Sequence, residues 1–358
     1  MEPILPDLLT FANGTPVQAF AWQERRDELL AAIIPHEYGG LPVAGGETEA
    51  VPLCSSAIRD SDGIGYRTYE VQTAFPGGGR HSFMLEVWVP GKGEGPFPVV
   101  LNGDGCWRYF NDAVVEQVLS RGNIAASFNR TVMAADDKEI YRNTGLYRQF
   151  RDAEFGALAA WAWGYHRAVD ALSQIDVVDS DKIAVTGHSR GGKAVLLAGA
   201  TDRRIALTNP NDSGIGGSGL NHWKCEGSEV IDDFIRVGSI FWFGKEWAEY
   251  QHRDKELPYD QHFLHALVAP RGLLITEAYR DNGANPPGSY AACLAVRPVY
   301  EMLGADDRLG WAVREGGHGH RPLDFETLLD AVDLQFHGRE AARDFQRELF
   351  PGLQELLL

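Results

Sequence analysis

A serine between two glycines is the feature of this sequence that most directly indicates chemistry. Gly187-His188-Ser189-Arg190-Gly191 has the spacing G-x-S-x-G. It follows the apolar run 182–186, typical of a short buried strand, and precedes residues 192–200, typical of a helix packed on a sheet. A serine on such a sharp turn presents its hydroxyl as a nucleophile. The sequence therefore predicts acyl transfer through Ser189.

A serine hydroxyl is a weak nucleophile until a base removes its proton. In hydrolases with this strand–turn–helix arrangement, the histidine comes last in the chain, after the acid. The segment 315–320 follows the last predicted strand and contains His318 and His320. Its glycines allow the loop to present either ring. Both histidines are candidate bases on this reasoning.

The acid that orients the histidine has two credible positions. One is the loop after the predicted strand 272–277, which offers Glu277 or Asp281. The other is the loop after the preceding strand, which contains Asp212. Both loops lie at the carboxyl ends of strands next to the elbow, so a carboxylate from either one could orient the imidazole.

The oxyanion of the transition state needs two donors. The backbone N–H of Arg190, directly after the nucleophile, is expected to supply one. The other is expected from the loop 102–107 or from the Arg190 guanidinium itself. Such preorganised donors are worth about 3–4 kcal/mol each in the transition state. The expected reaction requires no metal and no organic cofactor.

Short apolar strands alternate with helices along the chain. The sequence predicts helices at 20–36, 155–175 and 324–336, and strands at 64–74, 82–90, 97–103, 123–128, 183–186, 205–208, 272–277 and 310–315. This alternation predicts an α/β fold, a three-layer α/β/α sandwich of the α/β-hydrolase type with a mostly parallel, doubly wound sheet. We expect one catalytic domain over 1–358, with a helical and β-hairpin extension at about 1–95.

The composition excludes several classes of protein. The formal charge of −17 disfavours binding to nucleic acid or anionic membranes. The four cysteines are far apart and form no metal or disulfide motif. Residues 1–7 lack the features of a signal peptide, and no apolar run is long enough to span a membrane. We expect a cytoplasmic protein, or an exported one whose signal peptide has been removed.

Several segments together resemble one known family. Residues 187–194 are similar to the signature G-C-S-R-x-G-K-(G/A) of glucuronoyl esterases, carbohydrate esterase family 15. Residues 209–217 resemble the segment of that family that ends E-S-G-S-G-G, which implies that Asp212 is the acid. Residues 317–320 resemble G-H-x-H-C, which implies that His320 rather than His318 is the base. The resemblance extends from about 95 to 325, and Asp281 remains the second candidate for the acid.

The resemblance also carries expectations about the substrate. It implies that Lys193 hydrogen-bonds sugar hydroxyls, and Trp223 is a candidate for stacking on a sugar ring. The chain departs from the family pattern at His188 and Arg321, where many members have a disulfide-bonded cysteine pair. It also departs at Gly283, where members tend to have a sugar-stacking tryptophan.

These observations predict a serine carbohydrate esterase that hydrolyses 4-O-methyl-glucuronoyl esters of glucuronoxylan. The alternative on the same catalytic residues is the removal of acetyl groups from xylan or its oligosaccharides. A serine peptidase and a non-catalytic carbohydrate-binding protein are the further alternatives. The expected partner is a xylan-derived carbohydrate ester, with no nucleic acid and no membrane.

Overall fold

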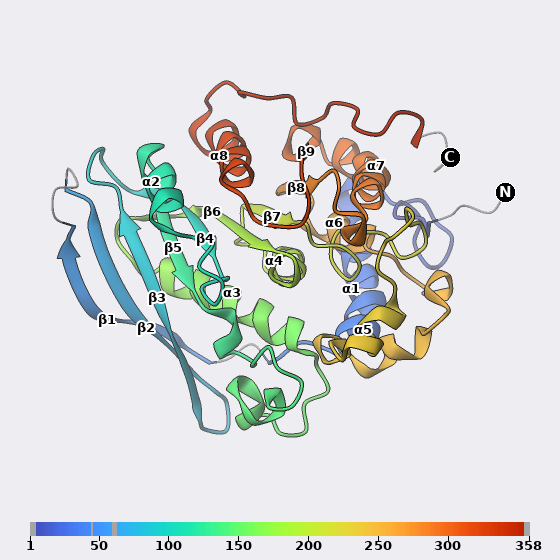
Figure 1. Ribbon diagram of the computed structural model, residues 1–358, viewed down its shortest axis with the longest axis horizontal. Coiled ribbons are helices and arrows are strands. Elements are labelled where there is room, and N and C mark those ends of the chain that lie inside the picture. The colour runs from blue at the N-terminus through green and yellow to red at the C-terminus, as the bar shows by residue number, and fades with distance from the viewer. Residues whose placement is uncertain (1–4, 44–45, 59–62, 354–358) are drawn as a thin grey trace.

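One nine-stranded sheet organises the part of the chain that the computed structural model describes, residues 5–43, 46–58 and 63–353 (Figure 1). The prediction that residues 1–7 lack the features of a signal peptide falls partly on residues 1–4, which lie outside the described residues. The strands are β1 (Thr48–Ala57), β2 (Gly65–Ala74), β3 (Arg80–Val89), β4 (Phe97–Asn102), β5 (Ile124–Phe128), β6 (Val178–His188), β7 (Leu207–Asn211), β8 (Gly272–Ala278) and β9 (Leu309–Arg314). The helices are α1 (Trp22–Tyr38), α2 (Asp112–Ser120), α3 (Ala157–Leu172), α4 (Arg190–Thr201), α5 (Ile231–Val237), α6 (His262–Val268), α7 (Pro286–Met302) and α8 (Pro322–His337).

The strand order is β1-β2-β3-β5-β4-β6-β7-β8-β9. The first three strands form an antiparallel meander, and β3 also pairs antiparallel with β5. All later pairs are parallel. The predicted strands 64–74 and 82–90 form an antiparallel hairpin, and Gly77, Gly78 and Gly79 in its turn all have positive φ. The prediction of a mostly parallel, doubly wound sheet is also confirmed.

Successive side chains of a strand point to opposite faces of the sheet, and each face carries a hydrophobic core. Val99 and Leu101 of β4 point into a core that includes residues of α1, α3, α4, α6 and α7, whereas Val100 points into a core formed with α2 and α8. Figure 1 shows α2 and α8 on one side of the sheet and α3 and α4 on the other. This arrangement confirms the predicted three layers. Among the described residues, no helix is both long and apolar enough to cross a membrane.

Some elements were not predicted. Strand β1 was not predicted because it lies at the edge of the sheet and its residues are mostly exposed, so it contains no run of buried apolar residues. Helix α7 was not predicted because it begins with two prolines and contains a third, Pro298. Proline is tolerated in the first turn of a helix, where its missing N–H has no partner in any case.

A fully buried ion pair connects the loops that surround the elbow. Asp104, just after β4, accepts a hydrogen bond from Arg130 Nε at 2.9 Å and another from the backbone N–H of His188 at 2.8 Å. The Arg130 guanidinium lies between the rings of Trp107 and Trp161, 4.6 and 4.3 Å from their centroids. The ends of β4, β5 and β6 are therefore held together by one carboxylate.

We predict that Arg130→Met lowers the free energy of unfolding by about 3–5 kcal/mol, because it leaves the Asp104 carboxyl group buried without its cation. Urea denaturation followed by tryptophan fluorescence measures the change. Lys245→Gln is the matched control, since Lys245 pairs with Glu154 at the surface, where ion pairs contribute little. A variant with methionine at 130 that unfolds at the wild-type urea concentration would contradict the assigned role of the pair.

Candidate active site

Ser189 occupies a strained turn between β6 and α4. Its backbone has φ 56° and ψ −123°, a conformation that residues other than glycine rarely adopt and that is concentrated at functional sites. Its N–H donates to the carbonyl of Asn211 at 2.8 Å, and its carbonyl accepts from the N–H of Lys193 at 3.0 Å. The predicted strand–turn–helix geometry around Ser189 is therefore present.

The glycines of the elbow are required by close contacts. A Cβ atom at Gly187 would lie 2.7 Å from the carbonyl oxygen of Gly191, and one at Gly191 would lie 2.1 Å from Asp104 Oδ1. Both distances are shorter than any normal contact of a Cβ atom. The G-x-S-x-G pattern thus follows from the packing of the elbow against the Asp104 carboxylate.

Ser189 opens into a cavity of about 230 Å³ at the carboxyl ends of the parallel strands. Its lining comes from the elbow, from the loops after β7, β8 and β9, and from α5 and the turn that follows it. The lining residues are Ser189, Arg190, Lys193, Asp212, Ser213, Gly214, Glu229, Phe234, Trp242, Asp281, Gly283, Ala284 and His318. The cavity therefore brings together the predicted nucleophile, one candidate base and both candidate aspartates.

His318 is the histidine in this cavity. Its Nδ1 lies 2.6 Å from Asp281 Oδ2, and its side chain is 48% exposed. The hydrogen bond to Asp281 raises the pKa of His318 above its ordinary value. An imidazole held by a carboxylate at one nitrogen, with the other nitrogen left to accept a proton, is the arrangement that a general base requires.

His320, the preferred base of the sequence analysis, does not line the cavity. It is 6% exposed and stacks on Phe325, with ring centroids 4.0 Å apart. Neither ring nitrogen has a hydrogen-bond partner among the described residues, and burial lowers its pKa well below the ordinary value. The intervening Gly319, at φ 150°, reorients the chain so that His318 faces the cavity and His320 faces α8. The geometry therefore favours His318 as the candidate base, and the role of either histidine stays a prediction.

Asp212 lies in the same cavity but is tied to the backbone around it. Its Oδ1 accepts from the N–H of Ala278 at 2.6 Å, and its Oδ2 accepts from Arg314 Nη2 at 3.1 Å. Burial raises the pKa of Asp212 to about 7, with the nearby Asp281 charge adding to the effect, and both outweigh Arg314. The direct partner of His318 is thus Asp281, the alternative acid, and Asp212 is a second carboxyl group beside it.

Glu277, the other acid considered in the same region, is buried and does not line the cavity. Burial raises its pKa well above the ordinary value, and the neighbouring Asp212 adds to the shift. Asp212 at the cavity wall and Glu277 behind it are therefore neighbours, in an environment that disfavours ionising both.

Arg190 and the loop 102–107 are the two predicted sources of oxyanion donors. In the loop 102–107, the N–H groups of Gly103, Asp104, Gly105 and Trp107 already donate to other acceptors. The Arg190 guanidinium donates to Asp136 at 3.1 Å and lies over the Trp242 ring at 4.4 Å. Of the two predicted sources of a second donor, the structure thus favours the guanidinium over these four amides.

The two predicted sugar contacts differ in position. Lys193 lines the cavity, and its buried Nζ donates to the carbonyls of Ser213 and, at 2.6 Å, Ile215. Trp223 does not line the cavity but packs partly buried against the core. Trp242 lines the cavity and was not predicted, because its distant turn at 240–242 carries no recognisable motif.

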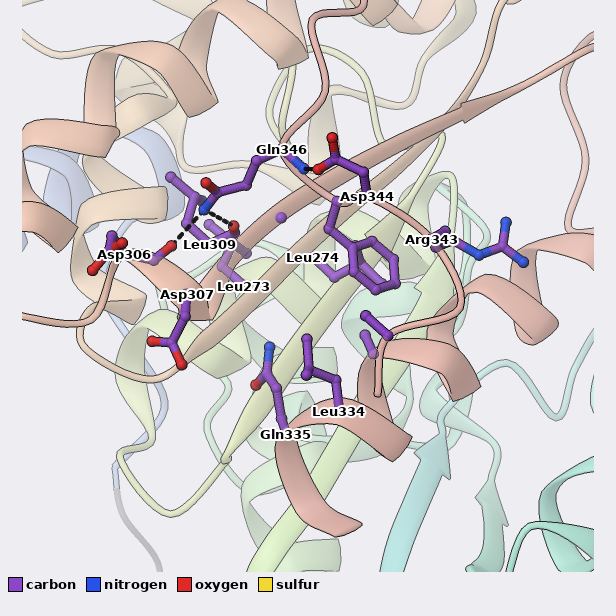
Figure 2. Close-up of a pocket in the computed structure, with 14 residues that line it drawn as sticks. Leu273, Leu274, Asp306, Asp307, Leu309, Leu334, Gln335, Arg343, Asp344 and Gln346 are labelled. Carbon is purple, nitrogen blue, oxygen red and sulfur yellow. Dashed lines mark hydrogen bonds between the residues drawn. The ribbon is translucent and has the colours of Figure 1, made fainter. Parts of the chain in front are cut away.

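A larger cavity of about 360 Å³ lies between β8, β9, α8 and the segment 341–346 (Figure 2). Leucines form much of its wall, and Gln346 closes one side by donating to the Leu309 carbonyl at 3.0 Å (Figure 2). None of the candidate catalytic residues lines it. Size alone therefore does not identify the site, and the chemistry lies in the smaller cavity.

The sequence of the chain is similar to one family model and to several characterised relatives. Residues 73–304 match the family model described as "Glucuronyl esterase, fungi". The chain is 33% identical over 328 residues to 4-O-methyl-glucuronoyl methylesterase 1 of Wolfiporia cocos, covering 88% of this chain and 76% of the relative. It is 31% identical over 358 residues to the 4-O-methyl-glucuronoyl methylesterase of Schizophyllum commune, covering 95% and 84%.

The fold of the chain is also similar to solved structures of esterases. A glucuronoyl esterase of carbohydrate esterase family 15 from Caldicellulosiruptor kristjansonii superposes with a TM-score of 0.85 at 31% identity, covering 97% of this chain and 94% of the other. The glucuronoyl esterase of Sporotrichum thermophile, in complex with methyl 4-O-methyl-beta-D-glucopyranuronate, superposes with a TM-score of 0.76 at 25% identity, covering 95% and 90%.

We predict that His318→Ala reduces kcat for ester hydrolysis by roughly 10²–10⁴-fold, the usual contribution of a general base. His320→Ala should leave kcat within about threefold of wild type and instead lower the thermal midpoint, since it removes a buried ring packed on Phe325. Steady-state kinetics and thermal melts of both variants measure this. The reverse pattern, with loss of kcat only in the variant at 320, would restore His320 as the base.

The pKa of His318 predicts the acid limb of the pH profile. Because the base must be neutral, kcat/KM should fall as pH drops through a pKa above the ordinary 6.5. Asp281→Asn should shift this inflection to lower pH and reduce kcat by roughly 10²-fold or more, since it removes the group that raises the pKa. Asp307→Asn, on the rim of the larger cavity, is the control. An unshifted inflection in the variant at 281 would assign the orienting role to Asp212.

Proposed function

The chain belongs to the glucuronoyl esterase family, and we propose that it hydrolyses 4-O-methyl-glucuronoyl esters of xylan-derived carbohydrates. The observation that carries the proposal is the presence of Ser189 in one cavity with the His318–Asp281 pair. The names of the relatives and the glucuronate complex of the Sporotrichum thermophile enzyme support the choice of substrate.

The reaction proceeds by acyl transfer. Ser189 Oγ attacks the ester carbonyl carbon while His318 takes the hydroxyl proton, and the carbonyl oxygen becomes an oxyanion. The N–H and guanidinium of Arg190 stabilise this oxyanion. Collapse of the intermediate expels the alcohol, which receives the proton from His318. Water, deprotonated by His318, then attacks the acyl-enzyme, and as the bond to Ser189 Oγ breaks, His318 returns its proton to that oxygen and free glucuronate leaves.

The two aspartates have different roles in this scheme. Asp281 accepts the Nδ1 proton of His318, fixes its tautomer and stabilises the imidazolium that forms. Asp212, whose pKa burial raises to about 7, is partly protonated near neutral pH and adds less negative charge to the cavity. This limits repulsion of the glucuronate product.

Lys193 is positioned to bind the sugar. An ammonium group has three N–H donors, and two of them go to the carbonyls of Ser213 and Ile215. The third is left for a sugar hydroxyl in the cavity. Trp242 serves another purpose, because its ring face packs on the Arg190 guanidinium and holds the oxyanion donor in place.

One observation favours acetylated xylan as the second candidate substrate. Gly283 lines the cavity without a side chain, and a Cβ atom there would have no neighbour closer than 3.9 Å. The wall of the cavity is open at this position, and no aromatic ring fills it to stack on a glucuronate. A small acetyl group depends less on such a contact.

A paired assay separates these readings. Wild type, Ser189→Ala and the surface control Ser55→Ala are compared on benzyl glucuronate and on an acetylated xylo-oligosaccharide. We expect wild type and Ser55→Ala to hydrolyse the glucuronate ester, and Ser189→Ala to lose roughly 10³-fold or more of the rate. Activity on the acetylated sugar alone would select the second candidate, and no serine-dependent activity on either would refute both.

A further inference from the structure

Three side chains beside the cavity, two of which line it, have the composition of a transition-metal site. His188, Asp212 and His318 each offer one ligand atom, and these atoms all lie within 4.8 Å of one another. They come from the end of β6 and from the loops after β7 and β9. Three elements distant in sequence therefore bring two imidazoles and one carboxylate to a single point.

Neighbouring groups already orient each member of this cluster. His318 Nδ1 lies 2.6 Å from Asp281 Oδ2, and His188 Nδ1 lies 2.7 Å from Asn211 Oδ1 and 4.0 Å from Asp212 Oδ2. Metal-binding histidines almost always have such an outer partner, often a carboxylate, which fixes the ring and raises its basicity. The cluster thus has the supporting contacts of a built site.

Asp212 retains a position for a cation. A carboxylate has about four lone-pair sites, and three are directed to the N–H of Ala278, to Arg314 and, at 3.4 Å, to the N–H of Gly319. The net charge of −17 also attracts cations to the protein as a whole. Arg314 opposes a cation at Asp212, whereas Asp281 behind His318 favours one.

We propose that His188, Asp212 and His318 form a binding site for Zn²⁺ that reversibly inhibits this enzyme. Two imidazoles and one carboxylate, with a fourth position open to water, are a ligand set that zinc prefers. Zinc bonds of about 2.0–2.2 Å require ligand atoms roughly 3.3 Å apart, so the distances within the cluster must shorten by up to about 1.5 Å. The half-exposed side chain of His318 has the freedom to make this movement.

The consequence for catalysis rests on the proposed function. In the proposed mechanism the His318 imidazole accepts the proton of Ser189, and zinc bound to that imidazole competes with this proton. A bound ion therefore removes the base and occupies the cavity, and it inhibits turnover until a chelator removes it. Zinc binding can be measured without substrate turnover, so the zinc site and the proposed esterase function can be refuted independently of each other.

Calorimetric titration of the whole protein with ZnCl₂ tests the site. We expect one Zn²⁺ per wild-type chain, at least tenfold weaker binding in His188→Gln, and wild-type binding in the control His252→Gln, whose exposed ring pairs with Asp232. Absence of binding in wild type, or unchanged binding in the variant at 188, would overturn the proposal.

A second measurement needs no substitution. Reaction of Ser189 with a serine-directed phosphonylating reagent fills the cavity, and it should abolish zinc binding by the wild-type chain. Zinc that binds equally to the modified protein would place the ion elsewhere and overturn the site. Zinc should also lower the wild-type esterase rate at least tenfold, with recovery in EDTA. A protein that binds zinc as proposed and yet hydrolyses no glucuronate ester would retain the site and refute the proposed function.

Discussion

The buried Asp104 carboxylate holds together the loops on which the active site is built. It accepts from Arg130 and from the backbone N–H of His188, and its Oδ1 occupies the space next to the Cα atom of Gly191. The turn at Ser189 is strained, and such conformations persist only where the surrounding structure enforces them. One ion pair, shielded by two tryptophans, thus links the sheet to the geometry of the nucleophile.

Burial also determines the pKa values of the carboxyl and imidazole groups around the cavity. Asp212 lines the cavity and Glu277 lies behind it, and burial raises the pKa of both carboxyl groups. Asp281 lies at the cavity wall and hydrogen-bonds to a half-exposed histidine. His318, the candidate base that lines the cavity, is thus the more exposed of the two histidines, whereas burial lowers the pKa of His320.

Much of the fold could be predicted from the sequence because its signals are local. The strand, turn and helix around Ser189 follow from an apolar run, two glycines and an alanine-rich segment within about twenty residues. The alternation of strands and helices likewise predicted the parallel, three-layer sheet. Edge strand β1 was not predicted because it buries little apolar surface, and helix α7 was not predicted because it begins with two prolines.

The sequence by itself determined the nucleophile turn, the fold class and the loops from which a base and an acid had to come. Only the tertiary structure decided which residues of those loops face Ser189. His318 and His320 are two residues apart among glycines, and no local pattern distinguishes them. The choice depends on the backbone at Gly319 and on the packing of His320 against Phe325 of α8. The pairing of His318 with Asp281 joins loops after two different strands, and such distances are set by the sheet rather than by neighbouring residues.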